Sequence, residues 1–495
     1  MASNRKQGLT LSADEVSNTM LELRRSGRPS SSLPAALRGL AVLLVGLGAL
    51  FAIALVAELA LPVRDGAHHD FLAFYGAGKL VLAADPAGIY DPARLTAVER
   101  TVVPGPVGAN GYMPFINPPF AAVAFVPLAA LSAEVARAVW AGISLALLVA
   151  AAVAVARPLA RDRALGALLI VLSFPAYHAL AEGQWSILLL ATGLAALAAG
   201  RRGRWGLVGL ALVPFWLKPQ FLLLPLVALV LARKWRALVT VGIGGAALVA
   251  LSLPFTGFAE YGRYAGYLAE VVTSHFTGAG AINATTWQGN LATTEGLNGL
   301  LVGYLGQSAV GLVNVLWLLS AGALVALYGL AAAREHPGFT TLRARAMLAA
   351  GILLTLLVNP NLYAQDCVLG YLALAALWPV PRRLWLAAIV ATVGLLDLIL
   401  LDQPAVTTHL FTVGLVGLVI LACLRAPRWR RSIGASESAR GGRAPHRPRA
   451  RLHGQPEGPA RQERADSAST STDDALWPRP DGGAKEKAGA VLEIC

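Results

Sequence analysis

The chain has 495 residues, of which 56% are hydrophobic and only 14% are charged, and its mean hydropathy is +0.59. Soluble globular domains carry roughly 25% charged residues, so this composition excludes a soluble enzyme and indicates a polytopic membrane protein. The formal net charge is +13, but the cations lie in the two tails and in short loops between apolar runs. That distribution is typical of cytoplasmic loops beside an anionic leaflet and argues against nucleic acid as a partner.

Apolar runs of roughly 18–25 residues recur along the chain, and each predicts a helix because lipid offers no hydrogen-bond partners to the backbone. The predicted fold class is all-α, a polytopic bundle of about 12 transmembrane helices with short surface-lying helices in the outer loops. We expect helices near residues 39–61, 137–156, 164–181, 184–199, 204–217, 219–232, 236–254, 307–333, 344–358, 364–379, 383–401 and 406–424. They form a transmembrane domain over residues 38–425, between polar segments 1–37 and 426–495 that we expect to be disordered and cytoplasmic.

Arginine placement predicts the topology. If every basic cluster lies inside, the helices alternate correctly and both termini are cytoplasmic in a multi-pass protein of the cytoplasmic (inner) membrane. The clusters are Arg24/Arg25/Arg28/Arg38, Arg157/Arg161/Arg163, Arg201/Arg202/Arg204, Arg233/Lys234/Arg236, Arg334/Arg343/Arg345, Arg382/Arg383 and Arg425/Arg428/Arg430.

Two segments need separate treatment. Residues 117–131 are apolar, but counting them as a span would invert everything downstream, so we expect a re-entrant or surface-lying segment led by Pro118 and Pro119. The helices at 204–217 and 219–232 are about 20 Å long each, and whether they cross the membrane stays open.

This topology puts the chemistry on the outer face. The long loops 62–116 and 255–306 lie outside, together with polar clusters at the ends of several helices. These clusters are at Asn117, Gln184, Lys218 and 359–366. Polar groups that converge on one face of a membrane protein indicate a functional cavity.

The first outer loop contains Asp70 at the start of a short helical pattern. Apolar residues at helical spacing follow on one face, which predicts an amphipathic helix that presents this face to lipid. They are Phe71, Phe74, Tyr75, Gly78 and Leu82. Two interpretations of Asp70 remain: an N-cap of this helix, or a general base that takes a hydroxyl proton at the edge of a membrane cavity.

A set of short motifs then points to a known family. They are Asp70-x3-Phe74-Tyr75-x-Ala77-Gly78, Ile89-Tyr90-Asp91, Asn117-Pro118-Pro119-Phe120 before Pro127-Leu128-Ala129, Gly183-Gln184-Trp185, Lys218-Pro219-Gln220 and Asn359-Pro360-Asn361-x-Tyr363-x2-Asp366. Over roughly residues 65–380 this order resembles glycosyltransferase family 87. The resemblance implies a GT-C fold and transfer of a hexose, often mannose, from a polyprenyl phosphate to a glycolipid or glycan acceptor. It also implies that Asp70 is the catalytic base and that Tyr75 lies in the substrate site.

The implied reaction is an inverting single displacement, which needs one base and cationic support for the departing phosphate. No nucleotide leaves, so we expect neither a metal nor a cofactor, and His68 and His69 beside Asp70 have poor spacing for metal ligands. Lys218 is either a snorkelling interfacial lysine or a contact to the donor phosphate. Gln184 and Gln220 are candidates for hydrogen bonds to sugar hydroxyls.

Other candidates have an ordinary structural interpretation beside the functional one. His178 and Glu182 are spaced as a structural pair on one helix face, or as a secondary acid and base. Trp287 and Asn290 suit either the membrane interface or sugar stacking and binding. The late cluster reads Asn361, Tyr363, Gln365 and Asp366 and has no histidine, whereas many members of the family carry one there. Either Asp366 takes part of that role or the acceptor differs.

Two non-enzymatic interpretations remain as alternatives. A transporter or lipid flippase would need polar residues along a path that reaches both sides, and no internal repeat supports it. A scaffold for envelope assembly would use the basic tail to recruit partners. As an enzyme, the chain would have as partners a polyprenyl-phosphate-linked sugar, a lipid or glycan acceptor, and membrane lipids.

Overall fold

The computed structural model describes residues 35–60, 70–103, 113–277, 294–334, 336–379, 381–401 and 409–424. All of them belong to one compact unit. Within these ranges the chain is helical, and the one isolated antiparallel bridge joins Glu295 to Leu362. The predicted all-α class is confirmed. The two tails predicted to be disordered lie outside the described residues, apart from the first helix, which begins at Ala35.

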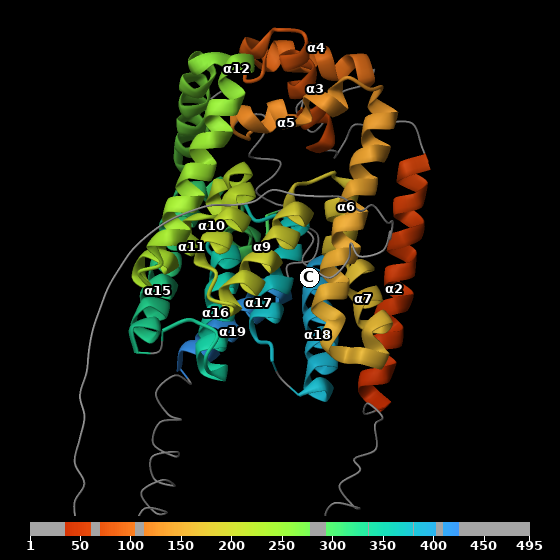
Figure 1. The fold of residues 1–495 in the computed structure, drawn as a ribbon, viewed down its shortest axis with the longest axis vertical. Coiled ribbons are helices and arrows are strands. Elements are labelled where there is room, and N and C mark those ends of the chain that lie inside the picture. The colour runs from red at the N-terminus through yellow and green to blue at the C-terminus, as the bar shows by residue number, and fades with distance from the viewer. Residues whose placement is uncertain are drawn as a thin grey trace, which may run out of the picture. The chain divides into compact units, whose positions relative to one another are not determined.

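Within the described ranges, a helix lies at every position that the sequence predicts, although several are broken (Figure 1). They are α2 (Ala35–Ala60), α6 (Ala133–Ala156), α7 (Arg163–Val171) with α8 (Phe174–Ala181), α9 (Ser186–Arg201), α10 (Trp205–Leu212) with η3 (Val213–Leu217), η4 (Pro219–Phe221) with α11 (Leu223–Leu231), α12 (Trp235–Thr277), α15 (Val310–Arg334), α16 (Leu342–Leu357), η8 (Ala364–Leu369) with α17 (Gly370–Ala376), α18 (Arg382–Asp397) with η9 (Leu398–Leu401), and α19 (Leu410–Leu424). Further elements are η2 (Arg157–Asp162), α14 (Gly296–Leu305) and η7 (Gln307–Ala309).

Among the described residues, four helices are long and apolar enough to cross a membrane. They are Leu37–Ala57, Ala133–Ala160, Trp235–Glu270 and Val310–Arg334. α7 and α8 make a fifth candidate if this pair, bent by 52°, counts as one span. The structure therefore supports a multi-pass membrane protein, but the predicted number of about 12 spans is not confirmed.

Proline explains several of the breaks. It stands in the first turn of α8, of η3 and of η4. Proline has no N–H to donate and restricts the residue before it, so a helix that reaches it ends or restarts there. The described chain has several apolar helices of 10–17 residues, some of them bounded by these prolines, and at 1.5 Å per residue they fall short of the roughly 30 Å hydrocarbon core.

Three short helices pack together at one end of the bundle, beside the second half of α12 (Figure 1). They are α3 (Asp70–Leu82), α4 (Pro92–Val102) and α5 (Pro119–Ala129), with the turn η1 (Pro86–Gly88) between the first two. We call them the cap. α5 has 11 residues and is too short to span a bilayer. A Cβ on Gly78 would lie 3.2 Å from the Phe125 backbone, so glycine allows α3 and α5 to approach closely.

The prediction that α3 presents its aromatic face to lipid is wrong. Four of the five residues on that face are buried, namely Phe71, Phe74, Tyr75 and Gly78. The ring of Phe74 lies 5.4 Å from Phe125 of α5 and 5.5 Å from Trp185, between ring centroids. Only Leu82, 48% exposed, stays at the surface. Aromatic side chains of the protein cover the face that the helical pattern assigned to lipid.

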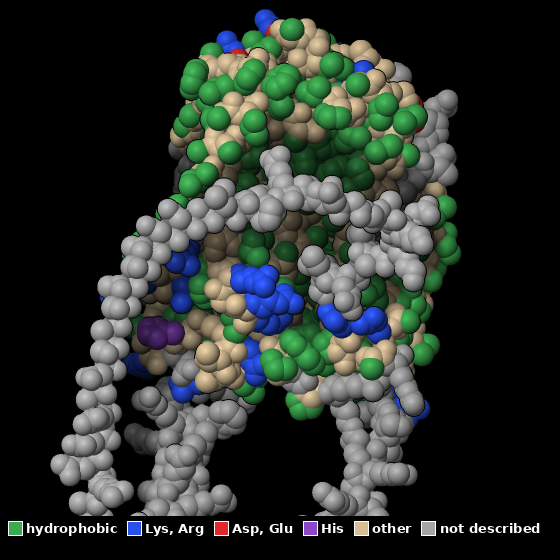
Figure 2. All heavy atoms as spheres, viewed as in Figure 1, with side chains coloured by type: hydrophobic (Ala, Val, Ile, Leu, Met, Phe, Trp, Pro, Cys, Tyr) green, Lys and Arg blue, Asp and Glu red, His purple; other side chains and the backbone are tan. Residues whose placement is uncertain are grey.

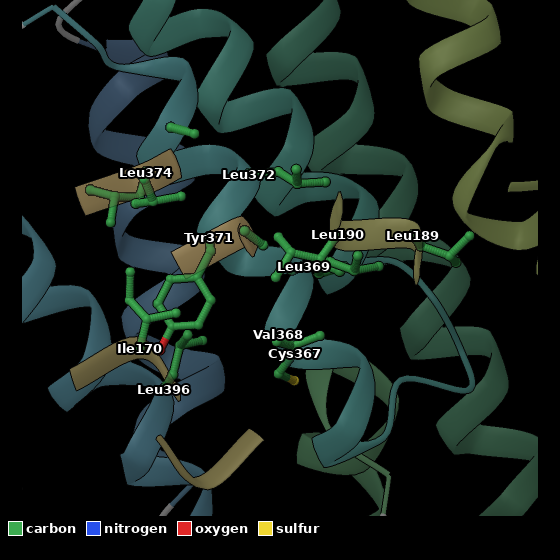
Figure 3. Close-up of a cluster of buried hydrophobic side chains, with 14 of the residues drawn as sticks. Ile170, Leu189, Leu190, Cys367, Val368, Leu369, Tyr371, Leu372, Leu374 and Leu396 are labelled. Carbon is green, nitrogen blue, oxygen red and sulfur yellow. The ribbon is translucent and has the colours of Figure 1, made fainter. Parts of the chain in front are cut away.

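A second core lies within the bundle and positions η8. Figure 3 shows Tyr371 of α17 between Ile170 of α7 and Leu396 of α18. Elsewhere in this core, a Cβ on Gly193 of α9 would lie 2.7 Å from the side chain of Leu372, which belongs to α17. Because η8 runs directly into α17 and also packs against α8 and α9, this core fixes the polar residues of η8.

The turn between α8 and α9 yields a first prediction. Gly183 has a φ of +67°, and a Cβ there would lie 2.8 Å from the Cβ of Phe71. Gly203 has a nearly identical φ of +68° but open space around it. Gly183→Ala should therefore lower the unfolding temperature more than Gly203→Ala, because both incur the backbone strain of about 1 kcal/mol but only one pushes α3 away. Thermal unfolding in detergent measures both, and equal losses would refute the steric argument.

Glu99 of α4 yields a second prediction. It is fully buried, and its carboxyl oxygens accept the N–H of Met113 at 3.0 and 3.2 Å. Burial raises the pKa of Glu99 from 4.5 to about 8. The folded state thus holds this proton more tightly than the unfolded state, so the contribution of Glu99 to stability is full below about pH 4.5 and is lost as pH rises through about 8.

Glu99→Gln should flatten this fall in the unfolding temperature between about pH 5 and about pH 9, because the amide needs no proton. The exposed Glu134 of α6 supplies the control, since Glu134→Gln should leave the wild-type slope unchanged. A wild-type slope that survives in Glu99→Gln would contradict the assignment.

Candidate active site

The first residue of α3 is attached to the end of α8. The N–H of Phe71 donates to the backbone carbonyl of Glu182 at 2.9 Å, and the N–H of Asp70 donates to Oε2 of Glu182 at 3.2 Å. Two free N–H groups at the start of a helix thereby find acceptors on a residue distant in sequence. Glu182 thus holds the start of α3 in place, in addition to any chemical role.

Two amides hold the Asp70 carboxylate. Oδ2 of Asp70 accepts a hydrogen bond from Nε2 of Gln184, and Nε2 of Gln365 lies 3.4 Å from the same oxygen. Within the described part of the chain, these amides, rather than N–H groups of its own helix, are its partners, so the geometry is not that of an N-cap. Burial raises the pKa of Asp70 above 3.8, while the hydrogen bond from Gln184 and the charge of Lys218 oppose this shift.

A buried ion pair lies next to this carboxylate. Nζ of Lys218 is 2.5 Å from Oδ1 of Asp366 and 3.4 Å from Oγ of Ser186, which donates to the same Oδ1. Lys218 is 8% exposed and Asp366 is 1% exposed. The break between η3 and η4 supplies the lysine, and η8 supplies the aspartate. The Ser186 hydroxyl helps to offset the desolvation of this pair.

The two groups form one site. Gln365 approaches Asp70, and the next residue on η8, Asp366, pairs with Lys218. The charges of Lys218 and Asp366 both act on Asp70. Tyr363, just before η8, lies near both aspartates: burial raises the pKa of its phenol, and the two carboxylates raise it further. Of the predicted residues, the structure thus brings together Asp70, Glu182, Gln184, Lys218, Tyr363 and Asp366.

Asn117 connects the cap to this site. Its side-chain Nδ2 donates to the backbone carbonyl of Leu217 at 2.8 Å, and its backbone carbonyl accepts a hydrogen bond from the hydroxyl of Tyr90 at 2.8 Å. Leu217 directly precedes Lys218, so Asn117 helps to place the lysine. Both hydrogen bonds join parts of the protein to each other, whereas the sequence suggested that Asn117 contacts the substrate.

Other predicted residues lie apart from this cluster or outside the described residues. The Tyr75 hydroxyl donates to the carbonyl of Leu131 at 2.9 Å, on the cap side. Gln220 is exposed on η4, and the backbone N–H of Asn361 donates to Asn359 at 3.0 Å. The ring of His178 packs edge-on against Phe174 one turn earlier, with 5.7 Å between centroids. Trp287, Asn290, His68 and His69 fall outside the described residues.

Sequence reasoning missed Ser186, and it placed Gln365 in the late cluster without giving it a role. Both stand at helix starts directly beside predicted residues, Ser186 after the Gln184-Trp185 motif and Gln365 before Asp366. Their nearness to those motifs was the available signal. Neither a serine nor a glutamine at a helix start is unusual enough to be noticed alone.

The ion pair yields a third prediction. Lys218→Met should destabilise the protein by about 3–5 kcal/mol, because it leaves Asp366 buried without its counter-charge. Lys218→Met combined with Asp366→Asn should recover part of this loss, and thermal unfolding measures the coupling.

The exposed pair of Arg94 and Asp85 is the control. Its atoms are 2.7 Å apart, with side chains 51% and 42% exposed. Arg94→Met should cost at most about 1 kcal/mol. A loss for Lys218→Met no larger than that of Arg94→Met would count against a desolvated pair.

Comparison with known protein families identifies a match. The family model described as glycosyltransferase family 87 matches residues 115–360. The matched region contains Asn117, Gln184 and Lys218, whereas Asp70 and Asp366 lie outside it. No curated protein and no solved structure shows a significant match. The match thus identifies the general activity, and the roles of individual residues rest on their geometry.

Proposed function

The chain belongs to glycosyltransferase family 87 and is therefore a membrane glycosyltransferase, and on that premise we propose that it uses a polyprenyl-phosphate hexose, with mannose the first candidate. In this proposal the acceptor is a glycolipid or glycan at the outer face of the cytoplasmic membrane, and the bundle is of the GT-C type. The observation that carries the proposal is the Asp70 carboxylate, held by two amides next to a buried Lys218–Asp366 pair.

Asp70 is the proposed general base. The acceptor hydroxyl oxygen attacks C1 of the sugar while Asp70 takes its proton; the bond from C1 to the phosphate oxygen breaks, and polyprenyl phosphate leaves with the electron pair. A single displacement of this kind inverts the configuration at C1. The raised pKa of Asp70 suits this role, because a base works best when its pKa approaches the ambient pH. The amides of Gln184 and Gln365 keep the carboxylate oriented.

Lys218 is the proposed support for the leaving group. Its ammonium carries three N–H donors, and Asp366 and Ser186 engage two of them. Among the described residues the third has no partner, and in this proposal it binds an oxygen of the donor phosphate. A cation that is already in place and screened from water stabilises developing charge without reorganisation. Asp366 is accordingly a positioning residue that holds Lys218.

The alternative of a transporter or flippase is not favoured by the family match. Glycosyl transfer also makes a purely scaffolding role unnecessary. Covalent chemistry distinguishes a transferase from a flippase. A transferase releases polyprenyl phosphate and forms a new glycoside, whereas a flippase moves an intact donor.

The experiment uses the full chain in lipid nanodiscs with a panel of polyprenyl-phosphate hexoses and glycolipid acceptors, followed by mass spectrometry. We expect release of polyprenyl phosphate from one donor with a matching new glycoside. Asp70→Asn should lower kcat at least about 100-fold with unchanged unfolding temperature, since the amide cannot take the proton.

Asp91→Asn is the matched control. Asp91 is an aspartate of the same loop that caps α4, accepting N–H groups of Ala93 and Arg94. Asparagine caps as well as aspartate, so activity should persist. Full activity of Asp70→Asn would remove Asp70 from the mechanism, and folded wild-type protein that transfers from no donor would overturn the proposed donor class.

A further inference from the structure

Two arginines lie at the end of the bundle remote from Asp70. Arg201 is the last residue of α9, about 22 Å along the helix from Ser186. Arg345 stands at the beginning of α16, whose other end leads to Asn359 and the segment that carries Asp366. This pair is thus separate from the proposed catalytic residues.

The two guanidinium groups are close together and incompletely paired. Arg201 donates to the carbonyl of Ala375 and lies over the ring of Phe339, 5.6 Å from its centroid. Arg345 is only 9% exposed. Among the described residues, Nε of both arginines is buried without a hydrogen-bond partner. The two positive charges act on each other, and none of the ion pairs in that part of the chain includes either arginine.

Such an arrangement is unfavourable by itself. A buried charge without a counter-charge is destabilising, and two like charges add to that cost. The position of Arg345 adds a third contribution, because the beginning of a helix carries the positive end of the helix dipole. The hydroxyl oxygen of Thr341 caps α16 by accepting the Ala344 N–H at 2.9 Å, but this neutral cap does not neutralise the charge of Arg345. A bound anion relieves all three contributions together.

We propose that Arg201 and Arg345 form a binding site for a phosphate-type anion, supplied by the headgroup of an anionic membrane lipid. Guanidinium groups match the paired oxygens of a phosphate diester. Both arginines stand at the ends of apolar helices, where headgroups lie, and basic pockets between such helices bind anionic lipids. Most Lys and Arg side chains visible in Figure 2 lie in the lower half of that face, which gives an anion a favourable field.

The experiment uses the full chain in phosphatidylcholine nanodiscs, alone, with phosphatidylglycerol, or with inorganic phosphate in the buffer. Phosphatidylglycerol should raise the unfolding temperature, and native mass spectrometry should show it retained on the released protein. Inorganic phosphate should give no such shift. A shift with inorganic phosphate as large as with the lipid would overturn the assignment of the lipid as the source.

Variants then locate the site. Arg201→Gln and Arg345→Gln should each abolish the lipid-induced shift and lower lipid retention about tenfold. Arg202→Gln, an exposed neighbour of Arg201, should retain both. Because glutamine removes a repulsive charge, the two variants should fold without the lipid. If either variant does not fold, retention by the other decides. Equal lipid shifts and equal retention in all three variants would overturn the site.

Discussion

The Lys218 ammonium and the Asp366 carboxylate form an ion pair from which water is largely excluded, and the arrangement of the surrounding helices makes this burial possible. Lys218 and Asp366 are drawn from distant parts of the chain, and each alone would be costly in apolar surroundings. Their mutual attraction and the Ser186 hydroxyl make the arrangement tolerable. Three elements must therefore meet at one point: the start of α9, the break between η3 and η4, and η8.

The broken helices follow from the same requirement. A continuous apolar helix has no free backbone ends in its interior, whereas a proline break provides a turn where a lysine can be placed. Lys218 stands at such a break, directly before Pro219. Asp366 likewise lies in a short 3-10 helix rather than in a long helix. The cost is that several apolar helices are shorter than a bilayer is thick.

The sequence predicts much of this site because polar residues stand out in an apolar chain. Asp70, Gln184, Lys218 and Asp366 were all identifiable in this way, and the structure brings them together. The apolar pattern correctly predicts that α3 is a helix, but it does not predict what covers the apolar face of α3. Lipid and a layer of aromatic side chains both favour the same apolar residues on that face. The number of spans was less predictable, since an apolar run has the same composition whether its helix is continuous or broken.

Gln365 and Asp366 are neighbours on η8, and one faces the Asp70 carboxylate while the other holds the Lys218 ammonium. A single peptide unit therefore links the anionic and the cationic halves of the site. The position of the Gln365 amide beside Asp70 is therefore tied to the position of the carboxylate that pairs with Lys218, because both side chains belong to the same turn of η8.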